Sequence, residues 1–307
     1  MGRYVIRRLL QMIPVFIGST FLIFFMVYAL GDPVAALFGD HAPDPATAAQ
    51  IRHDLYLDHS LPAQYVHYMK NIFTGDFGTA FSGQSVTALM GSAFPVTIRL
   101  TVVAVLFEIV IGIILGVVTG MKRGKPIDTG VLLLTLVVIS VPTFVTGYVL
   151  QYLFGVQLKW VASSVSPSAP FNELLLPGLV LALVSLAYVT RLTRTSIAEN
   201  TRADYVRTAV AKGLPRHRVI IRHLLRNSLI PVVTFIGTDI GALMGGAIVT
   251  ERIFNIHGVG FELYQGILRN NAPTVVGFVT ILVLVFLLAN LLVDLLYAVL
   301  DPRIRYA

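Results

Sequence analysis

The chain has 307 residues, of which 56% are hydrophobic and only 13% are charged, with a net charge of +7 and no cysteine. Soluble domains carry roughly 25% charged residues, and several apolar runs here exceed the ~18 residues that predict a membrane-spanning helix. The composition therefore predicts an all-α polytopic membrane protein. Because cysteine is absent, disulfides and cysteine nucleophiles are excluded. We attribute the excess of positive charge to the cytoplasmic bias of lysine and arginine in membrane proteins rather than to a surface that binds nucleic acid.

The first predicted span is Leu9–Leu30, and it follows a start that holds Arg3, Arg7 and Arg8. These arginines are similar to the basic start of a signal peptide. The apolar run is too long for a cleaved leader, however, and no A-x-A cleavage site follows it. We therefore expect residues 1–30 to form a cytoplasmic tip and a retained membrane helix.

A small extracytoplasmic domain is predicted over residues 31–94. The part from Gly31 to Gly91 is too polar to span a membrane, and it holds six aspartates against one arginine and one lysine. Apolar residues at helical spacing predict two short helices in it, Ala46–Leu55 and Pro62–Phe73.

Residues 95–300 are predicted to form a membrane core of five helices, with a cytoplasmic tail over 301–307. An outer loop is expected over 250–272 and a cytoplasmic loop over 197–226. Most of the lysines and arginines lie in segments that this topology assigns to the cytoplasm, so both termini are placed there. The expected core spans are Pro95–Met121, Thr129–Val156, Leu174–Leu192, Leu229–Val249 and Pro273–Leu300.

The cytoplasmic loop is polar and strongly basic within an otherwise apolar chain. Residues 204–212 are good helix formers, Gly213 is a typical helix end, and Pro215 suits the first turn of a second helix that runs to Ser228. From the pattern alone, this bent pair is compatible with a helix lying on lipid, with a solvated loop, and with a helix that docks in a groove of a cytoplasmic partner. The first helix has one predicted apolar face: Tyr205, Val206, Ala209 and Val210.

No motif for nucleotide, metal or catalytic chemistry is present. The sequence has no G-x-x-x-x-G-K-[ST], and its nearest approach, Gly120–Lys125, is followed by Pro126. It has no H-E-x-x-H, and His217 and His223 lie among arginines that would repel a metal ion. We therefore expect no catalytic, cofactor-binding or metal-binding residue in this chain.

Taken together, the motifs along the chain resemble the ABC importer permeases for dipeptides, oligopeptides and nickel, of the first permease subunit type. In the cytoplasmic loop they are DYVRTAVAKGL and RHLLRNSLIPVVT, where Arg207-Thr208-Ala209 stands in place of the family's Glu-Ala-Ala. The outer loop has His257 where the family usually has proline. The other matching stretches, in chain order, are GDP, LDHSLPAQYVHYM, GDFGTAF, RGKPID, SVPTF, RLTRTS, TERIFNIHGVGFELYQGILRNNAP and NLLVDLLYAVLDPRIRY.

This resemblance implies a type I importer permease fold, with a five-helix core and an extra N-terminal helix, in a bacterial or archaeal cytoplasmic membrane. It implies a heterodimer with a paralogous permease subunit, two cytoplasmic ATPase subunits that bind ATP and magnesium, and an extracytoplasmic solute-binding protein. The chain would then form half of a translocation pathway for di- or oligopeptides in contact with membrane lipid, and would not be an enzyme by itself.

The resemblance also assigns candidate contacts. The ATPase would dock on residues of the cytoplasmic loop: Asp204, Tyr205, Arg207, Thr208, Ala209, Lys212, Gly213 and Leu214. The solute-binding protein would face residues of the outer segments: Asp58, Asp76, Glu251, His257, Gly258 and Glu262.

Carboxylates inside predicted spans are functional candidates, because a charge is costly in lipid. Asp294 lies near the inner interface, where pairing with a basic residue is expected. Glu108 and Asp239 lie deeper, and each would either face the pathway or pair within the bundle. They keep an alternative open, an ion-coupled secondary transporter that uses Glu108 or Asp239; a membrane scaffold without transport activity is a further alternative.

Glycine and proline mark the remaining pathway or gate candidates. Gly112 and Gly116 form one G-x-x-x-G and Gly237 and Gly241 another, a spacing typical of close helix packing. The stretch Gly241–Gly246, which includes Gly245, would alternatively let the fifth span flex as a gate. Pro142 is expected to kink the third span, and with Ser140 it would either expose backbone to a polar cavity or leave a satisfied kink.

Overall fold

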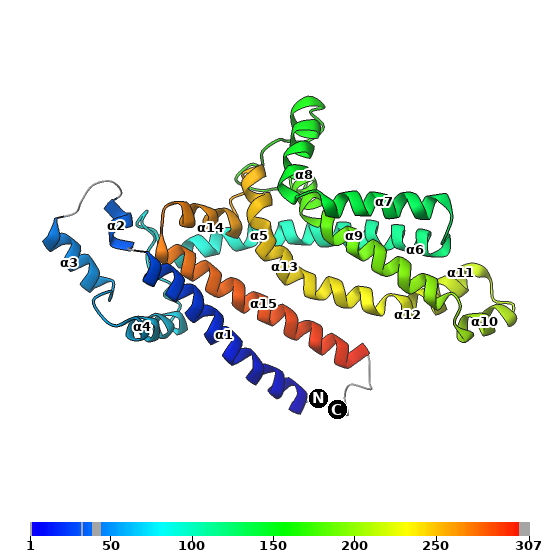
Figure 1. Ribbon diagram of the computed structural model, residues 1–307, viewed down its shortest axis with the longest axis horizontal. Helices are drawn as coiled ribbons and strands as arrows, with labels where there is room; N and C mark the ends of the chain where they lie inside the picture. Colours follow the sequence, from blue (N-terminus) through cyan, green and yellow to red (C-terminus); the bar gives the residue numbers. More distant parts are fainter. Residues whose placement is uncertain (1, 32, 39–43, 301–307) are drawn as a thin grey trace. The chain divides into compact units, whose positions relative to one another are not determined.

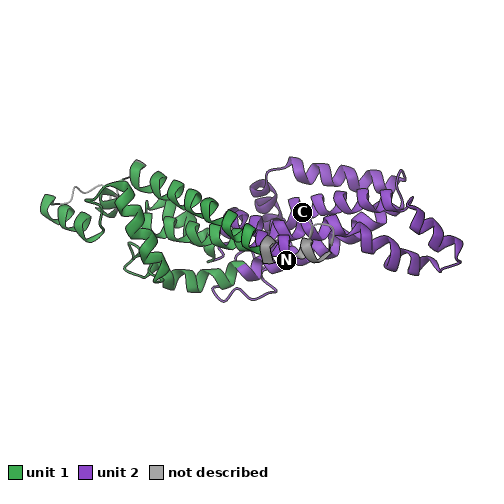
Figure 2. Ribbon diagram, turned by 90° about the horizontal axis from the view of Figure 1, so that it is seen from below, with its two compact units in different colours: residues 1–97, 257–288 green, residues 98–256, 289–307 purple. Residues whose placement is uncertain are grey.

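The computed structural model describes residues 2–31, 33–38 and 44–300 (Figure 1). Within them the regular structure is helical, and the one extended pairing is an isolated antiparallel bridge between Thr79 and Ser85. The chain divides into two compact units, which Figure 2 colours separately. Unit 1 comprises residues 1–97 and 257–288, and unit 2 comprises residues 98–256 and 289–307.

Unit 1 contains both helices predicted for the outer segment, as well as two short helices that the pattern did not predict. Its helices are α1 (Gly2–Leu30), α2 (Pro33–Phe38), α3 (Pro45–Asp54), α4 (Leu61–Phe73), α14 (Val259–Leu268) and the first parts of α5 (Val86–Phe107) and α15 (Ala272–Leu300). Asp44 caps α3 by accepting from the Thr47 N–H, and Pro45 occupies the first turn, which needs no N–H donor.

The core of unit 1 joins α1, α4 and α15. Phe24, Tyr65 and Val276 are buried together. The Thr20 hydroxyl lies 2.8 Å from the Tyr65 hydroxyl, and the Tyr68 hydroxyl lies 3.0 Å from that of Thr280. Since each of these hydroxyls has a partner, the phenols fix the angle of α4 against the two long helices.

Unit 2 is built around α9 (Leu175–Asn200), which packs against α6, α7, α8, α13 and η1. The other elements of the unit are the end of α5, the π-helical turn η1 (Glu108–Gly112), α6 (Ile113–Met121), α7 (Pro126–Ser140), α8 (Thr143–Leu150), η2 (Gln151–Gln157), α10 (Asp204–Ala211), α11 (Arg216–Arg218), η3 (Val219–Leu225), α12 (Arg226–Ser228), α13 (Ile230–Phe254) and the end of α15.

Close packing of η1 and α6 on α9 explains the first glycine pair. A Cβ atom at Gly112 would lie 2.8 Å from Val189 Cγ1, and one at Gly116 would lie 2.7 Å from the Thr190 carbonyl oxygen. Neither position can hold a side chain without moving α9 away. The packing role predicted for Gly112 and Gly116 is therefore confirmed.

Five helices are long and apolar enough to cross a membrane, and a sixth span is present if α7 and α8–η2 count as one bent span. This agrees with the predicted six-span membrane fold, with three corrections at the level of elements. The second span begins at Val86 rather than Pro95, because the helix accommodates that proline; the boundary expected at residue 94 lies inside α5. The fifth span continues to Phe254, so the start of the expected outer loop is helical, and α14 occupies much of the remainder.

The third correction concerns Pro142. The proline pushes Val141 into an extended conformation, with φ −92° and ψ 127°, and so ends α7 at Ser140. The two halves of the predicted third span then meet at an angle of 104°. This is a break in the span, much larger than the kink predicted from the sequence.

Candidate functional site

The cytoplasmic loop has the predicted bend. Gly213 adopts a left-handed conformation with φ 72°, and its N–H donates to the Val210 carbonyl at 2.9 Å. Glycine adopts this conformation without a Cβ clash, so it ends α10 cleanly. Pro215 then starts the helical stretch Arg216–Ser228, formed by α11, η3 and α12.

In the structure, only part of the apolar face predicted for α10 is buried. Val206 and Ala209, three residues apart, are buried at 6% and 4% exposure in a cluster with Ile197, Val219 and Leu224. This cluster holds α10 against α9 and η3 of its own unit. Ala209, predicted to contact an ATPase, is therefore a core residue of this chain.

The outward face of α10 carries most of the other predicted docking residues. Val210 is 60% exposed, and Asp204 and Arg207 form an exposed ion pair at 3.7 Å that contributes little to stability. Leu214 is half-buried against the apolar cluster. The outward face is thus polar and mainly basic around one projecting valine: Asp204, Tyr205, Arg207, Thr208, Val210, Lys212 and Gly213 are exposed.

A buried ion pair that the sequence analysis missed stabilises the base of this region. Arg194 Nε donates to Asp128 Oδ1 at 2.5 Å and its Nη2 donates to Oδ2 at 2.8 Å, while the Gly124 N–H donates to Oδ2 at 2.8 Å. The Asp128 side chain is 3% exposed and that of Arg194 is 18% exposed. The two-pronged contact fixes the start of α7 to the end of α9. The sequence feature that could have pointed to this ion pair is an aspartate in the first turn of an apolar helix.

Glu108 and Asp239, two of the pathway candidates, are brought together in unit 2. Glu108 is the first residue of η1 and is wholly buried, and its carboxyl faces that of Asp239, beside Ser185. Both Glu108 oxygens and one Asp239 oxygen are buried without a hydrogen-bond partner. Within the described residues neither carboxyl has an ion-pair partner.

The structure therefore places this carboxyl pair inside the helix bundle of unit 2, and the role predicted for it in the pathway stays a prediction. The π-helical turn contributes to the arrangement, since such a turn shifts the residues that follow it and is frequent at functional sites. Three elements meet here: η1 supplies Glu108, α9 supplies Ser185 and α13 supplies Asp239.

The other gate candidates in unit 2 differ in exposure. Ser140 donates to the Leu136 carbonyl at 2.8 Å, and both Ser140 and Pro142 are exposed at the break between α7 and α8. Gly241 is buried, whereas Gly245 is exposed and a Cβ atom there would meet nothing within 4 Å. Gly245 thus has room for a partner surface, and no contact with another described residue requires a glycine there.

Among the outer candidates in unit 1, Asp58 and Asp76 are exposed. Asp58 bridges two histidines, with oxygens 2.8 Å from His53 Nδ1 and 2.7 Å from His59 Nδ1. The hydrogen bond to His53 lowers the pKa of Asp58, and the same contact raises the pKa of His53. Asp76 accepts from the Gly78 N–H at 2.8 Å.

The remaining outer candidates differ in accessibility. His257 is exposed, and its ring lies 4.5 Å from that of Phe261. Glu262 is half-buried, and burial raises its pKa, with His257 and Arg269 acting in the opposite direction. Gly258 is buried, and Glu251 is wholly buried because α13 extends past it. Glu251 therefore faces the interior of the chain, not a surface that a second protein reaches.

Two family models together cover almost the whole chain. The binding-protein-dependent transport system inner membrane component matches residues 109–306, and the N-terminal part of the membrane component of binding-protein-dependent transport systems matches residues 1–111. Both describe permeases, which agrees with the six-span helical fold.

Individual relatives are similar over their full length. The di/tripeptide transport system permease protein DppB of Pseudomonas aeruginosa is 36% identical, over 99% of this chain and 98% of that protein. The dipeptide transport system permease protein DppB of Escherichia coli K12 is 37% identical, over 100% and 99%. The glutathione transport system permease protein GsiC of Salmonella choleraesuis is 36% identical, over 100% of both chains. The chain therefore belongs to the family of binding-protein-dependent transport system inner membrane components, the multi-pass permease subunits of ABC importers.

Proposed function

We propose that this chain forms half of the translocation pathway of an ATP-driven importer for short peptides. The observation that carries the proposal is similarity along the entire chain to permeases named for dipeptides, di/tripeptides and glutathione, all of which are peptides. The cytoplasmic loop supports it, because α10 presents a basic, partly apolar outward face while its inward face is packed on its own unit.

The partners in this proposal are a paralogous permease subunit, two cytoplasmic ATPase subunits and an extracytoplasmic solute-binding protein. ATP and magnesium bind the ATPase subunits, and we expect no catalytic, cofactor-binding or metal-binding residue in this chain. Both termini and α10 are cytoplasmic, while α2, α3, α4 and α14 lie on the outer side of a bacterial or archaeal cytoplasmic membrane.

Coupling follows from how α10 is attached. Since Val206 and Ala209 are buried against Ile197 of α9, a displacement of α10 by the ATPases also moves the cytoplasmic end of α9. That end is further tied to α7 through Asp128 and Arg194. ATP shifts the transporter between inward-facing and outward-facing states only as far as it binds one state more tightly.

The test is reconstitution of the chain with its partner subunits in liposomes, followed by peptide uptake. The proposal expects an ATPase subunit to co-purify with the chain and uptake to require ATP on the ATPase side. Uptake that persists after ATP is removed and stops when the proton gradient is collapsed would contradict it and favour the ion-coupled alternative. The variant Glu108→Gln sharpens the distinction, because a carrier coupled to an ion through Glu108 would lose uptake.

A further inference from the structure

Helix α4 of unit 1 contacts α1 well inside the apolar span of that helix, which covers Val5–Ala29. The Tyr65 hydroxyl donates to the Ile17 carbonyl at 3.1 Å and lies 2.8 Å from the Thr20 hydroxyl. Thr20 is nine residues before Ala29, which is roughly 14 Å along the helix axis. The tip of Tyr65 therefore lies at a depth that the hydrocarbon of a bilayer occupies.

The contact of α4 with α15 lies at a similar depth. The apolar span of α15 begins at Ala272, and Thr280, eight residues further on, is roughly 12 Å along the axis. The Thr280 hydroxyl lies 3.0 Å from that of Tyr68, which is one turn after Tyr65 on α4. Both long helices thus indicate that the tyrosines of α4 reach into the leaflet that borders the outer ends of the spans.

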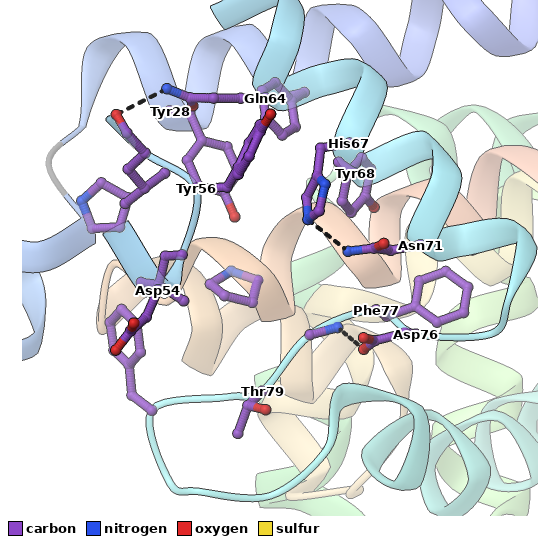
Figure 3. Close-up of a pocket in the computed structure, with 17 residues that line it drawn as sticks. Tyr28, Asp54, Tyr56, Gln64, His67, Tyr68, Asn71, Asp76, Phe77 and Thr79 are labelled. Atoms are coloured by element: carbon purple, nitrogen blue, oxygen red, sulfur yellow. Dashed lines mark hydrogen bonds between the residues drawn. The ribbon is translucent and has the colours of Figure 1, made fainter. Parts of the chain in front are cut away.

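One flank of α4, beside these tyrosines, is polar. Gln64, His67 and Asn71 recur on it at spacings of three and four residues. All three line a cavity of about 250 Å³, together with residues of the segments 54–57 and 76–81 (Figure 3). Irregular backbone of this kind does not lie in contact with lipid hydrocarbon. The polar flank therefore faces the loops of unit 1 and the aqueous side.

The opposite flank of α4 is apolar and uncovered. Pro62, Val66 and Phe73 share it, at spacings of four and seven residues. Val66 is 67% exposed, and Phe73, at 84%, is the most exposed large apolar side chain in the described part of the chain. Lys70 is exposed on the same flank. Large apolar side chains that gather on an exposed face mark an interaction surface.

The position of this flank favours lipid as its occupant. At the level of α1 that contacts α4, the outward side chains are also apolar and exposed: Leu22 at 59%, Phe25 at 43% and Met26 at 50%. A bilayer covers such a surface on a membrane span, and α4 lies at the same depth. Since the polar flank faces the loops, the apolar flank faces the hydrocarbon. Lys70 suits this boundary, because its aliphatic stem packs along apolar surface while its ammonium group stays among polar headgroups.

We infer that α4 is an interfacial membrane helix whose apolar flank inserts into the outer leaflet. Val66 and Phe73 lie among the acyl chains, and Lys70 lies at the level of the lipid phosphates. The assignment to the outer leaflet uses the orientation proposed above. The segment expected to be an extracytoplasmic domain is then anchored in the bilayer by one of its own helices, in addition to the spans that flank it.

Spin labels on single cysteines test this inference in the full chain, assembled with cysteine-free partner subunits in phosphatidylcholine vesicles. Val66→Cys and Phe73→Cys each place one label on the apolar flank, because the chain has no cysteine of its own. The controls are Leu22→Cys on the lipid-facing surface of α1 and Ser82→Cys on an exposed loop of the same unit. Relaxation of each label by oxygen, which concentrates in hydrocarbon, is compared with relaxation by a water-soluble nickel chelate.

The ratio of oxygen to nickel relaxation gives the answer. We expect the ratio at positions 66 and 73 to approach that at position 22 and to exceed that at position 82 severalfold. Strong relaxation by nickel at positions 66 and 73 would overturn the inference, because the flank would then face water. Weak relaxation by both reagents would also overturn it, because a protein partner would then cover the flank.

The result for α4 is separable from that for the proposed function. If ATP-driven peptide uptake is intact while nickel reaches positions 66 and 73, the lipid inference fails and peptide import stands. If both positions lie in hydrocarbon while uptake does not need ATP, the importer proposal fails and the interfacial helix stands.

Discussion

Asp128 and Glu108 are both buried acidic side chains of unit 2, but only Asp128 has a cationic side chain beside it. Asp128 receives three hydrogen bonds, two of them from Arg194, whereas the carboxyl of Glu108 faces that of Asp239, which in turn lies beside Ser185. The hydropathy pattern singled out Glu108, because it interrupts a span, and passed over Asp128 at a span end. Sequence separation explains the omission, since nothing local to Asp128 indicates that Arg194 will reach it.

Replacing Asp128 should be costly. The variant Asp128→Asn leaves the Arg194 guanidinium without its carboxylate in a mostly buried site, so we expect the free energy of unfolding to fall by about 3 kcal/mol. Thermal unfolding in detergent measures the change, with Asp44→Asn as the exposed control that keeps its cap. Equal stability of the two variants would show that the buried pair contributes no more than a surface charge.

For Glu108, in contrast to Asp128, we expect removal of the carboxyl charge to cost no stability. Since its carboxyl has no cation partner among the described residues, Glu108→Gln breaks no ion pair and keeps the side-chain volume, and stability should be unchanged or higher. The comparison variant Glu108→Ala opens a cavity and should lose about 2 kcal/mol or more. If the glutamine variant is destabilised as much as the alanine variant, a cation must accompany the pair in the folded protein.

The Asp58 bridge predicts a pH window. Because its hydrogen bonds raise the pKa of His53 above 6.5, their contribution is fully present below pH 6.5 and is lost as the pH rises through the raised value. Because they lower the pKa of Asp58 below 3.8, the contribution is also lost as the pH falls through that lowered value. The segment should be most rigid between these limits. NMR titration of His53 checks this prediction. In the variant Asp58→Asn, the pKa of His53 should return towards its ordinary value. An unchanged titration of His53 in that variant would refute the bridge.

At the scale of elements, the presence of the helices followed from the sequence better than the shape of the spans did. The bend after α10 was predicted because Gly213 and Pro215 act locally through backbone conformation. The 104° break at Pro142 and the π-helical turn at Glu108 were missed. Their geometry depends on how α8 and η1 pack against α9, and periodicity along one segment contains no such information. For the same reason the pattern could not separate buried Ala209 from exposed Val210.

The helix end at Gly213 permits a matched comparison. Gly213 and Gly83 both have left-handed φ, 72° and 80°, with nothing within 4 Å of an added Cβ. Gly213→Val and Gly83→Val should therefore lose similar stability, roughly 1–2 kcal/mol each. We expect only Gly213→Val to lower the peptide taken up per ATP hydrolysed, because it alone reorients α10. The same ratio in both variants would count against a docking role for the α10 bend.

At the scale of the whole molecule, the long apolar runs and the motif order identified the membrane class and the family, and the full-length relatives confirm both. The cavity in unit 1 could not be predicted in this way. Its wall brings together residues from α1, α4, two loops and the start of α15, and only the folded chain shows that they meet.

The most direct test of the central claim, that an ATPase docks on the outward face of α10, uses the absence of cysteine in the chain. Val210→Cys places a single thiol on that face, and Ser82→Cys places one on an exposed part of unit 1. Maleimide labelling of each variant is measured with and without the ATPase subunits. The account predicts that the ATPase protects the thiol at position 210 and leaves that at position 82 reactive. Undiminished labelling at position 210 in the assembled complex would contradict it.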